Sequence, residues 1–397
     1  MNLNIVSQKA VVSWQFWLLV ALVLPLGVTL GEAGGKPIIF DISSVALPFL
    51  VAAKLCWGKV QRKTFLILLL LTYFPILSMF SAISRGGEIS PIVSAASFML
   101  PVTHIFSGFA LSRLSLRDVL IVVARTFAII VIALALTDLL TSPFLRGCGY
   151  EGRWGGCLGP FEVFGFVNAS ANYLAILSPL LVYLYLCGPR RGDRIIARIG
   201  FILLIIICFL SLSRSASLLI IISTFSVAAY YFGIIFPFVF AIFSLLFFYF
   251  FSEVISSDVI SGVVARTRNA IEAGDITTGR IGIWADAFNA ALERPLFGQA
   301  FMHFSEISEY GTTHQQYLEV LFKAGFLGFF IYFGVLVYGC VLMFRRLRCE
   351  CLPAWPFGLL VFLTLISCFF QPIISYHTFG GLVFFLTGYV LERRGDS

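Results

Sequence analysis

Charged residues are scarce in this chain. Asp, Glu, Lys and Arg make up 12% of its 397 residues, whereas a soluble domain carries about a quarter. This scarcity excludes an ordinary soluble globular protein. Hydrophobic residues make up 59%, and they form runs of roughly 18 or more, the length that an α-helix needs to cross a bilayer. The composition therefore predicts an all-α, polytopic integral membrane protein.

Several catalytic motifs are also absent. The chain has no GxxxxGK[ST] phosphate loop, which excludes an ATP-driven motor of that kind. It has no HExxH motif and no Cys/His cluster, so we expect no zinc hydrolase. It has no GxSxG elbow, and its predicted outside loops lack an Asp-x-Asp pair that would hold a divalent cation on a sugar nucleotide. We therefore expect chemistry without a metal or other cofactor, based on arginines and a base.

The apolar runs predict about twelve transmembrane helices in one domain covering residues 1–397. Two outside segments interrupt them: a loop at 139–165, rich in Gly and aromatic residues, and a large loop at 252–314 between the ninth and tenth helices. The expected helices are 11–31, 37–57, 64–84, 90–112, 119–138, 166–187, 199–212, 215–232, 234–251, 315–344, 354–373 and 377–391.

Lys and Arg are concentrated on one side of this twelve-helix arrangement. That side holds 16 of the 27 basic residues, in loops such as KVQRK, PRRGDR and RRLR. Cytoplasmic loops carry such an excess, so we expect both termini in the cytoplasm and the two outside segments across the membrane. The net charge of +7 then reflects orientation in a lipid bilayer, and we expect no nucleic-acid partner.

The first outside loop contains two cysteines, Cys148 and Cys157, in LRGCGYEGRWGGCLG. In an oxidising compartment they could close a small disulfide ring, and two free thiols are the alternative.

The large loop is predicted to contain short amphipathic helices. Ile281, Trp284, Phe288 and Ala291 recur at helical spacing and would lie on one face of a helix. Pro295 is expected to end this helix.

Three polar residues stand out beside the apolar helices. Arg214, in LSLSRSAS, lies at the predicted outer end of a helix, where a charge is costly unless it meets water or an anion. Arg280 lies in the first turn of a loop helix, where free N–H groups and a guanidinium could hold an anion. His314 precedes the tenth helix, and a neutral imidazole can accept a proton. The alternatives are a snorkelling arginine, a solvated surface arginine and a polar helix cap.

Together these side chains suggest one chemistry. Guanidinium groups bind phosphate oxygens in a bidentate manner and stabilise the charge of a departing diphosphate, while a histidine takes a proton from a hydroxyl. These two functions are the ones that glycosyl transfer from a lipid diphosphate requires. Tyr317 lies on the His314 face, and Glu319 and Lys323 are predicted to pair at i, i+4.

Four segments resemble the O-antigen ligase and O-antigen polymerase superfamily of bacterial inner-membrane glycosyltransferases, which act at the periplasmic face. They are LSRSA (212–216), GRIGIW (279–284), ERPLFGQAF (293–301) and HQQYLEVLFKAGFLG (314–328). Their order also fits that family, as does a large loop ahead of the histidine.

The resemblance implies a GT-C-like fold and a glycan donor on undecaprenyl diphosphate. It also implies an acceptor that is a glycan or lipid A–core, inversion at the anomeric carbon, and a chain-length regulator as a partner. Arg214 and Arg280 would hold the diphosphate, and His314 would be the base. Gln315 replaces the family's usual Asn. Further substrate-binding candidates are Arg266, Arg268, Gln315 and Tyr317.

The charge of the large loop bears on the choice between polymerase and ligase. Residues 252–314 carry a net charge of −4, whereas lipid A–core is strongly anionic and favours a basic surface. This favours a surface-polysaccharide polymerase, with an O-antigen ligase as the alternative.

A secondary transporter or lipid-glycan flippase is the alternative of another class. Many transporters have repeated halves and polar groups near the membrane midplane, and no repeat is evident here. Asp41 would be the coupling carboxylate of such a protein. Arg125, within a predicted helix, is expected to snorkel toward the cytoplasm.

Overall fold

The computed structural model describes twelve stretches of the chain, from which all structural statements below are drawn. They are residues 27–33, 36–41, 62–112, 114–141, 157–158, 161–162, 167–211, 213–233, 235, 280–309, 312–371 and 377–392.

Helices dominate the described residues, with two short antiparallel strand pairs beside them. The helices are α4 (Arg62–Leu71), α5 (Tyr73–Ser84), α6 (Ser90–Leu111), α7 (Leu116–Thr141), α8 (Val167–Cys187), α9 (Arg191–Leu210), α10 (Arg214–Phe232), α13 (Arg280–Glu293), the 3₁₀ turn η1 (Phe304–Glu306), α14 (Gln316–Cys349), α15 (Trp355–Ser367) and α16 (His377–Glu392). The strands are β1 (Gly27–Ala33), β2 (Lys36–Asp41), β3 (Cys157–Leu158) and β4 (Phe161–Glu162).

Four stretches of described helix are long and apolar enough to cross a membrane. They are Arg62–Ser84, Leu116–Leu136, Arg214–Phe232 and Gln316–Cys349. Shorter apolar helices cover Ala171–Cys187, Trp355–Ser367 and Gly381–Leu391. The chain is therefore a helical integral membrane protein. The predicted ranges from 64 to 232 and from 315 to 391 contain these helices, whereas the ninth, 234–251, lies almost wholly outside the described residues.

The first two predicted helices are wrong where they approach each other. Residues 27–33 and 36–41 form the antiparallel pair β1–β2, with Ala33 opposite Lys36 and Gly27 opposite Asp41. The apolar run hid a hairpin signal, because Gly34-Gly35 is a favoured two-residue hairpin connection and Val28, Ile38 and Ile39 suit strands. Asp41, the candidate for ion coupling, is therefore the last residue of β2 and does not lie in a helix.

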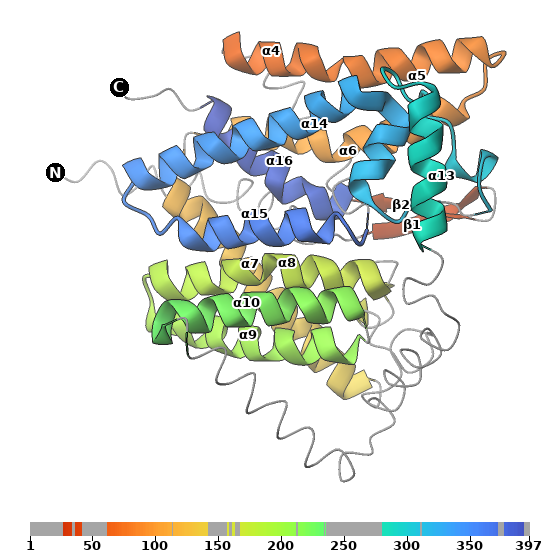
Figure 1. Cartoon of the computed structure of the whole chain (residues 1–397). Helices are drawn as coiled ribbons and strands as arrows, with labels where there is room; N and C mark the ends of the chain where they lie inside the picture. The colour runs from red at the N-terminus through yellow and green to blue at the C-terminus, as the bar shows by residue number, and fades with distance from the viewer. Residues whose placement is uncertain are drawn as a thin grey trace.

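The long helices run roughly alongside one another in two groups (Figure 1). Helices α7, α8, α9 and α10 pack together, and α6, α14 and α16 form the other group, with α15 against α8 and α10. Helices α6 and α16 cross very closely, because Gly108 and Gly388 each lie against the partner's backbone with no room for a Cβ atom.

The sequence predicts that Arg125 snorkels toward the cytoplasm, but in the structure its side chain is held by an ion pair. Its guanidinium makes a bidentate pair with Asp193 at the start of α9, with Nε–Oδ1 at 2.8 Å and Nη2–Oδ2 at 3.0 Å. Sequence alone could not show this, since the partner is 68 residues away and belongs to another helix.

Helix α14 is broken at Gly325, and the segment that follows α13 fills the break. Gly325 has φ 65° and ψ −171°. The N–H groups of Gln299 and Phe301 donate to the carbonyls of Phe322 and Lys323 at 2.6 and 3.0 Å. In return, the N–H groups of Phe326 and Leu327 donate to the carbonyls of residues 295 and 296 at 2.8 and 3.3 Å. The ERPLFGQAF and LFKAGFLG segments are thus bonded through their backbones.

We expect Gly325→Ala to destabilise the protein. The backbone conformation at this position is nearly exclusive to glycine, and a Cβ atom would overlap the Leu296 backbone. Strain of this kind costs about 1–3 kcal/mol, so thermal unfolding in detergent should begin at a lower temperature. Gly334→Ala is the matched control, because it lies in the same helix with open space around it. Equal melting temperatures for the two variants would contradict the close backbone packing described at Gly325.

Candidate active site

Arg214 is the first residue of α10, directly after the short turn that follows α9. Ser213 caps the helix: its hydroxyl accepts the Ala216 N–H at 3.4 Å. The Ser211 hydroxyl accepts the Ser213 N–H at 3.2 Å and donates to the Cys208 carbonyl at 2.7 Å. The serines of LSLSRSAS therefore build the turn, and the Arg214 side chain is left exposed at a helix N-terminus.

Arg280 is the first residue of α13, and it is partly buried. The four residues predicted to share one face of this helix divide in the structure: Ala291 is buried and Trp284 is half-buried. Ile281 and Phe288 are exposed, and the buried residues are Ile283, Ala287, Ala290 and Ala291. The helix approaches α14 through its short alanine side chains, so the packed face is the one with small residues.

His314 lies just before α14 in the left-handed region, with φ 53°. Its N–H donates to the Thr312 hydroxyl at 3.1 Å, which helps to hold this uncommon conformation. The side chain is partly buried. Histidine is among the residues that adopt left-handed backbone more readily.

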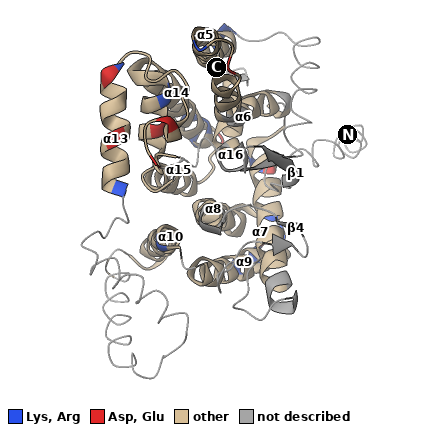
Figure 2. Ribbon diagram, turned by 90° about the vertical axis from the view of Figure 1, so that its right-hand side faces the viewer, with Lys and Arg blue, Asp and Glu red and all other residues tan. Residues whose placement is uncertain are grey.

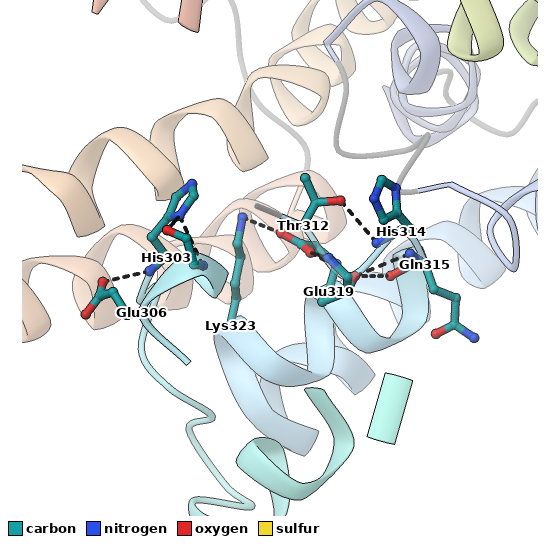
Figure 3. A network of polar contacts seen from close by, with 9 residues as sticks. His303, Glu306, Thr312, His314, Gln315, Glu319 and Lys323 are labelled. Carbon is teal, nitrogen blue, oxygen red and sulfur yellow. Dashed lines mark hydrogen bonds and ion pairs between the residues drawn. The ribbon is translucent and has the colours of Figure 1, made fainter. Parts of the chain in front are cut away.

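The buried carboxylate of Glu319 holds the segment 312–315, which contains His314 (Figure 3). Glu319 Oε2 accepts from the Thr313 hydroxyl at 2.9 Å and the Thr313 N–H at 3.3 Å. Its other oxygen pairs with Lys323 Nζ at 2.6 Å, which confirms the predicted i, i+4 pair. The network anchors Thr313, the residue directly before His314, to Glu319 in the first turn of α14. Sequence reasoning missed Thr313, although a Thr shortly before a helix is a usual sign of local capping.

Arg280 interacts electrostatically with Arg214 on one side and with His314 on the other. Burial lowers the pKa of Arg280, and the positive charge of Arg214 lowers it further. Burial also lowers the pKa of His314, Arg280 acts in the same direction, and Glu319 opposes both. Each of the three residues stands at or just before the start of a helix.

The remaining candidates divide into two groups. Gln315 uses its amide oxygen to cap α14, accepting the Leu318 N–H at 3.0 Å, which leaves its NH₂ group to donate. The Tyr317 hydroxyl donates to the Leu365 carbonyl at 2.9 Å, and its ring stacks on Phe333. Both side chains thus have structural contacts. Arg266 and Arg268 lie outside the described residues, as does Cys148 of the predicted disulfide.

The site has an excess of positive charge. In the part of the chain that the structure describes, no ion pair joins Arg214 or Arg280 to a carboxylate, whereas Arg85, Arg125, Lys323 and Arg346 all have one. Helix N-termini add partial positive charge. Two guanidiniums near each other without a carboxylate favour the binding of an anion, and Arg-phosphate contacts are frequently bidentate.

The fold and the site define a helical integral membrane protein with a cationic, histidine-containing site at the ends of its helices. Residues 199–333 match the family described as O-antigen ligase. This segment is about a third of the chain, and it contains Arg214, Arg280 and His314. The match confirms the resemblance over these residues. No curated protein matches the chain.

The pKa of His314 predicts how any base-catalysed activity will depend on pH. The base must be neutral, and this pKa lies below its ordinary value of 6.5. The reaction rate should therefore stay constant from pH 8 to about 7 and fall only as the pH drops below about 6.5. Initial rates of purified protein in nanodiscs, measured across this range, test the prediction. A midpoint of the acidic decline above the ordinary histidine value would contradict it.

Proposed function

We propose that this protein is an inverting glycosyltransferase that moves a glycan from undecaprenyl diphosphate to a sugar hydroxyl at the periplasmic face of the bacterial inner membrane. The observation that carries the proposal is the electrostatic interaction of Arg280 with both Arg214 and His314. The similarity of residues 199–333 to the O-antigen ligase family supports the same chemistry.

The two arginines would bind the diphosphate. As the bond between the anomeric carbon and the diphosphate oxygen breaks, the bonding electrons leave with the diphosphate, whose negative charge grows. Guanidinium groups held in place beforehand stabilise that charge without reorganising. The like-charge repulsion between Arg214 and Arg280 would be relieved when the anion binds.

His314 would act as the general base. The acceptor hydroxyl loses its proton to the imidazole as its oxygen attacks the anomeric carbon from the face opposite the diphosphate. Inversion follows from this single displacement. The lowered pKa of His314 keeps the imidazole neutral, and so able to accept the proton, at neutral pH.

The positions of the basic residues support a periplasmic site. Helix α14 carries Arg346 and Arg348 in its last turn, at the opposite end from His314. Helix α9 begins at Arg191, whereas Arg214 follows the other end of α9. The excess of Lys and Arg on the side away from the site fits a cytoplasmic location for those loops.

We further propose that no metal takes part, since two arginines can supply the charge that a divalent cation would provide. Among the described residues, no group of three or more His, Cys, Asp and Glu side chains is arranged to hold a metal ion. Transfer by purified protein should persist in EDTA, and activity that EDTA removes and magnesium restores would overturn this part of the proposal.

A polysaccharide polymerase fits the charge of the outside segment best. Residues 280–309 contain four carboxylates and two arginines, a surface poorly suited to anionic lipid A–core. O-antigen ligase is the second candidate, because the matching family carries that description.

Lipopolysaccharide from a deletion strain, analysed on a gel, separates the candidates. Single repeat units on core indicate loss of a polymerase. Bare core with lipid-linked chains accumulating outside indicates loss of a ligase. Bare core with lipid-linked units retained on the cytoplasmic side would indicate a flippase and overturn the proposal. Restoration by the wild-type gene is the control.

Arg214→Lys should impair transfer even though it keeps the charge. Lysine is a point charge and cannot reproduce the fork that binds two phosphate oxygens. Losing one charge-assisted hydrogen bond costs about 1.5–3 kcal/mol, or roughly tenfold to a hundredfold in rate. Rates of glycan transfer in nanodiscs measure the effect, and a rate equal to the wild type would exclude bidentate binding by Arg214.

A further inference from the structure

Helix α13 has three distinct faces. Ile283, Ala287, Ala290 and Ala291 are buried against the neighbouring segments. Asp286, Asn289 and Glu293 form an exposed polar face. Between these two faces runs an exposed apolar stripe of large side chains, Ile281, Phe288 and Leu292, which are 64%, 44% and 48% exposed. The turn after the helix extends the stripe with Leu296 and Phe297, at 61% and 51%.

A helix with separate apolar and polar faces outside the core is typical of a segment that lies in a lipid interface. Helix α13 crosses the direction of the long helices in Figure 1, and it lies at the edge of the bundle when the bundle is viewed along those helices in Figure 2. Helix α13 is therefore beside the bundle and not over its middle.

The backbone hydrogen bonds at the break in α14 fix where the stripe lies along that helix. Residues 324–344 of α14 carry no charged side chain, and at 1.5 Å per residue they span about 31 Å, the thickness of the hydrocarbon core. Phe326 and Leu327, at the start of this stretch, bond to the carbonyls of residues 295 and 296. Leu296 and Phe297, which are exposed, therefore lie level with the start of this uncharged stretch.

We propose that the stripe formed by Ile281, Phe288, Leu292, Leu296 and Phe297 rests in the lipid interface of the leaflet that surrounds the start of the α14 apolar stretch. The occupant of this surface is bilayer phospholipid. The apolar stripe takes the acyl-chain side, and Asp286, Asn289 and Glu293 take the aqueous side. This anchoring holds the segment that begins with Arg280 at headgroup height.

Photo-crosslinking tests the proposal in the full chain. p-Benzoylphenylalanine replaces Phe288, Leu292 or Phe297 on the stripe, and Asn289 or Glu293 on the polar face as matched controls. Each protein is reconstituted in nanodiscs of phosphatidylethanolamine and phosphatidylglycerol, irradiated, and examined by intact-mass spectrometry and on gels. Because all five sites are exposed, the substitutions should leave folding intact.

We expect phospholipid adducts at the three stripe positions at several-fold higher yield than at the two polar positions. Equal yields at all five positions would overturn the proposal, as would the lack of any lipid adduct on the stripe. Cross-links from the stripe to a second protein copy would also overturn it, because they would show that another chain covers this face.

Discussion

Replacing Arg280 with alanine should abolish measurable glycan transfer, with a loss of about a hundredfold to a thousandfold, as is usual when a preorganised charge donor to the departing group is removed. Arg280 begins α13, is partly buried, and lies close enough to Arg214 and His314 to lower the pKa of the histidine. The variant should insert and fold normally, because no carboxylate among the described residues pairs with this guanidinium.

Arg294→Ala is the matched control for this experiment. Arg294 follows the other end of the same helix and is exposed. Surface display of polysaccharide in cells and transfer rates in nanodiscs measure both variants. If Arg280→Ala supports normal polysaccharide, the proposed diphosphate site is wrong. If both variants lose activity equally, the effect reflects the charge of the segment and not the position of Arg280.

Removing the imidazole of His314 should lower the rate by about a hundredfold to ten-thousandfold, the usual contribution of a general base. Two variants separate chemistry from backbone strain. His314→Ala loses the base and also places alanine at φ 53°, which is unfavourable. His314→Asn loses the base, but Asn tolerates the left-handed conformation. We expect both variants to be inactive and His314→Asn to keep the melting temperature of the wild type.

His303→Ala is the matched control for the histidine. His303 Nδ1 accepts the Ser305 N–H at 3.3 Å in an exposed turn, so its loss should leave transfer unchanged. Added imidazole should partly restore His314→Ala, because a small free base can enter the space. Full activity of His314→Asn would exclude this residue as the base, and the account would then need another proton acceptor.

The membrane helices could be predicted from the sequence because their signal is local. Apolar runs of sufficient length mark α4 with α5, α7, α10 and α14. The hairpin β1–β2 was missed because hydrophobicity does not distinguish a strand from a helix over a short run.

The buried face of α13 could not be predicted from hydrophobicity alone. The large residues Ile281 and Phe288 point outward, and alanines form the packed face. Their exposure agrees with the proposed contact with lipid, which the sequence pattern does not show. Gly298 and Gly325 each lie against the backbone of the other's segment, with no room for a Cβ atom. The sequence does not show this, because it depends on two segments meeting at the break in α14.

The candidate residues were chosen from their chemistry and from a family resemblance, and their proximity could not be read from the sequence. Arg214 and Arg280 begin α10 and α13, and His314 lies just before α14, so the three residues are far apart in the sequence. Whether such starts meet depends on tertiary packing. The supporting network of Thr313 and Glu319 was only half visible, as the Glu319–Lys323 pair, because hydrogen bonds to a loop have no fixed spacing.

The most direct test is a cryo-electron microscopy structure of the protein in nanodiscs with undecaprenyl diphosphate bound. We expect both phosphates between the guanidiniums of Arg214 and Arg280, with the His314 imidazole facing the terminal phosphate, where the anomeric carbon of the donor would be attached. Diphosphate bound at another place, or at the end of the bundle where α14 finishes with Arg346 and Arg348, would contradict this expectation.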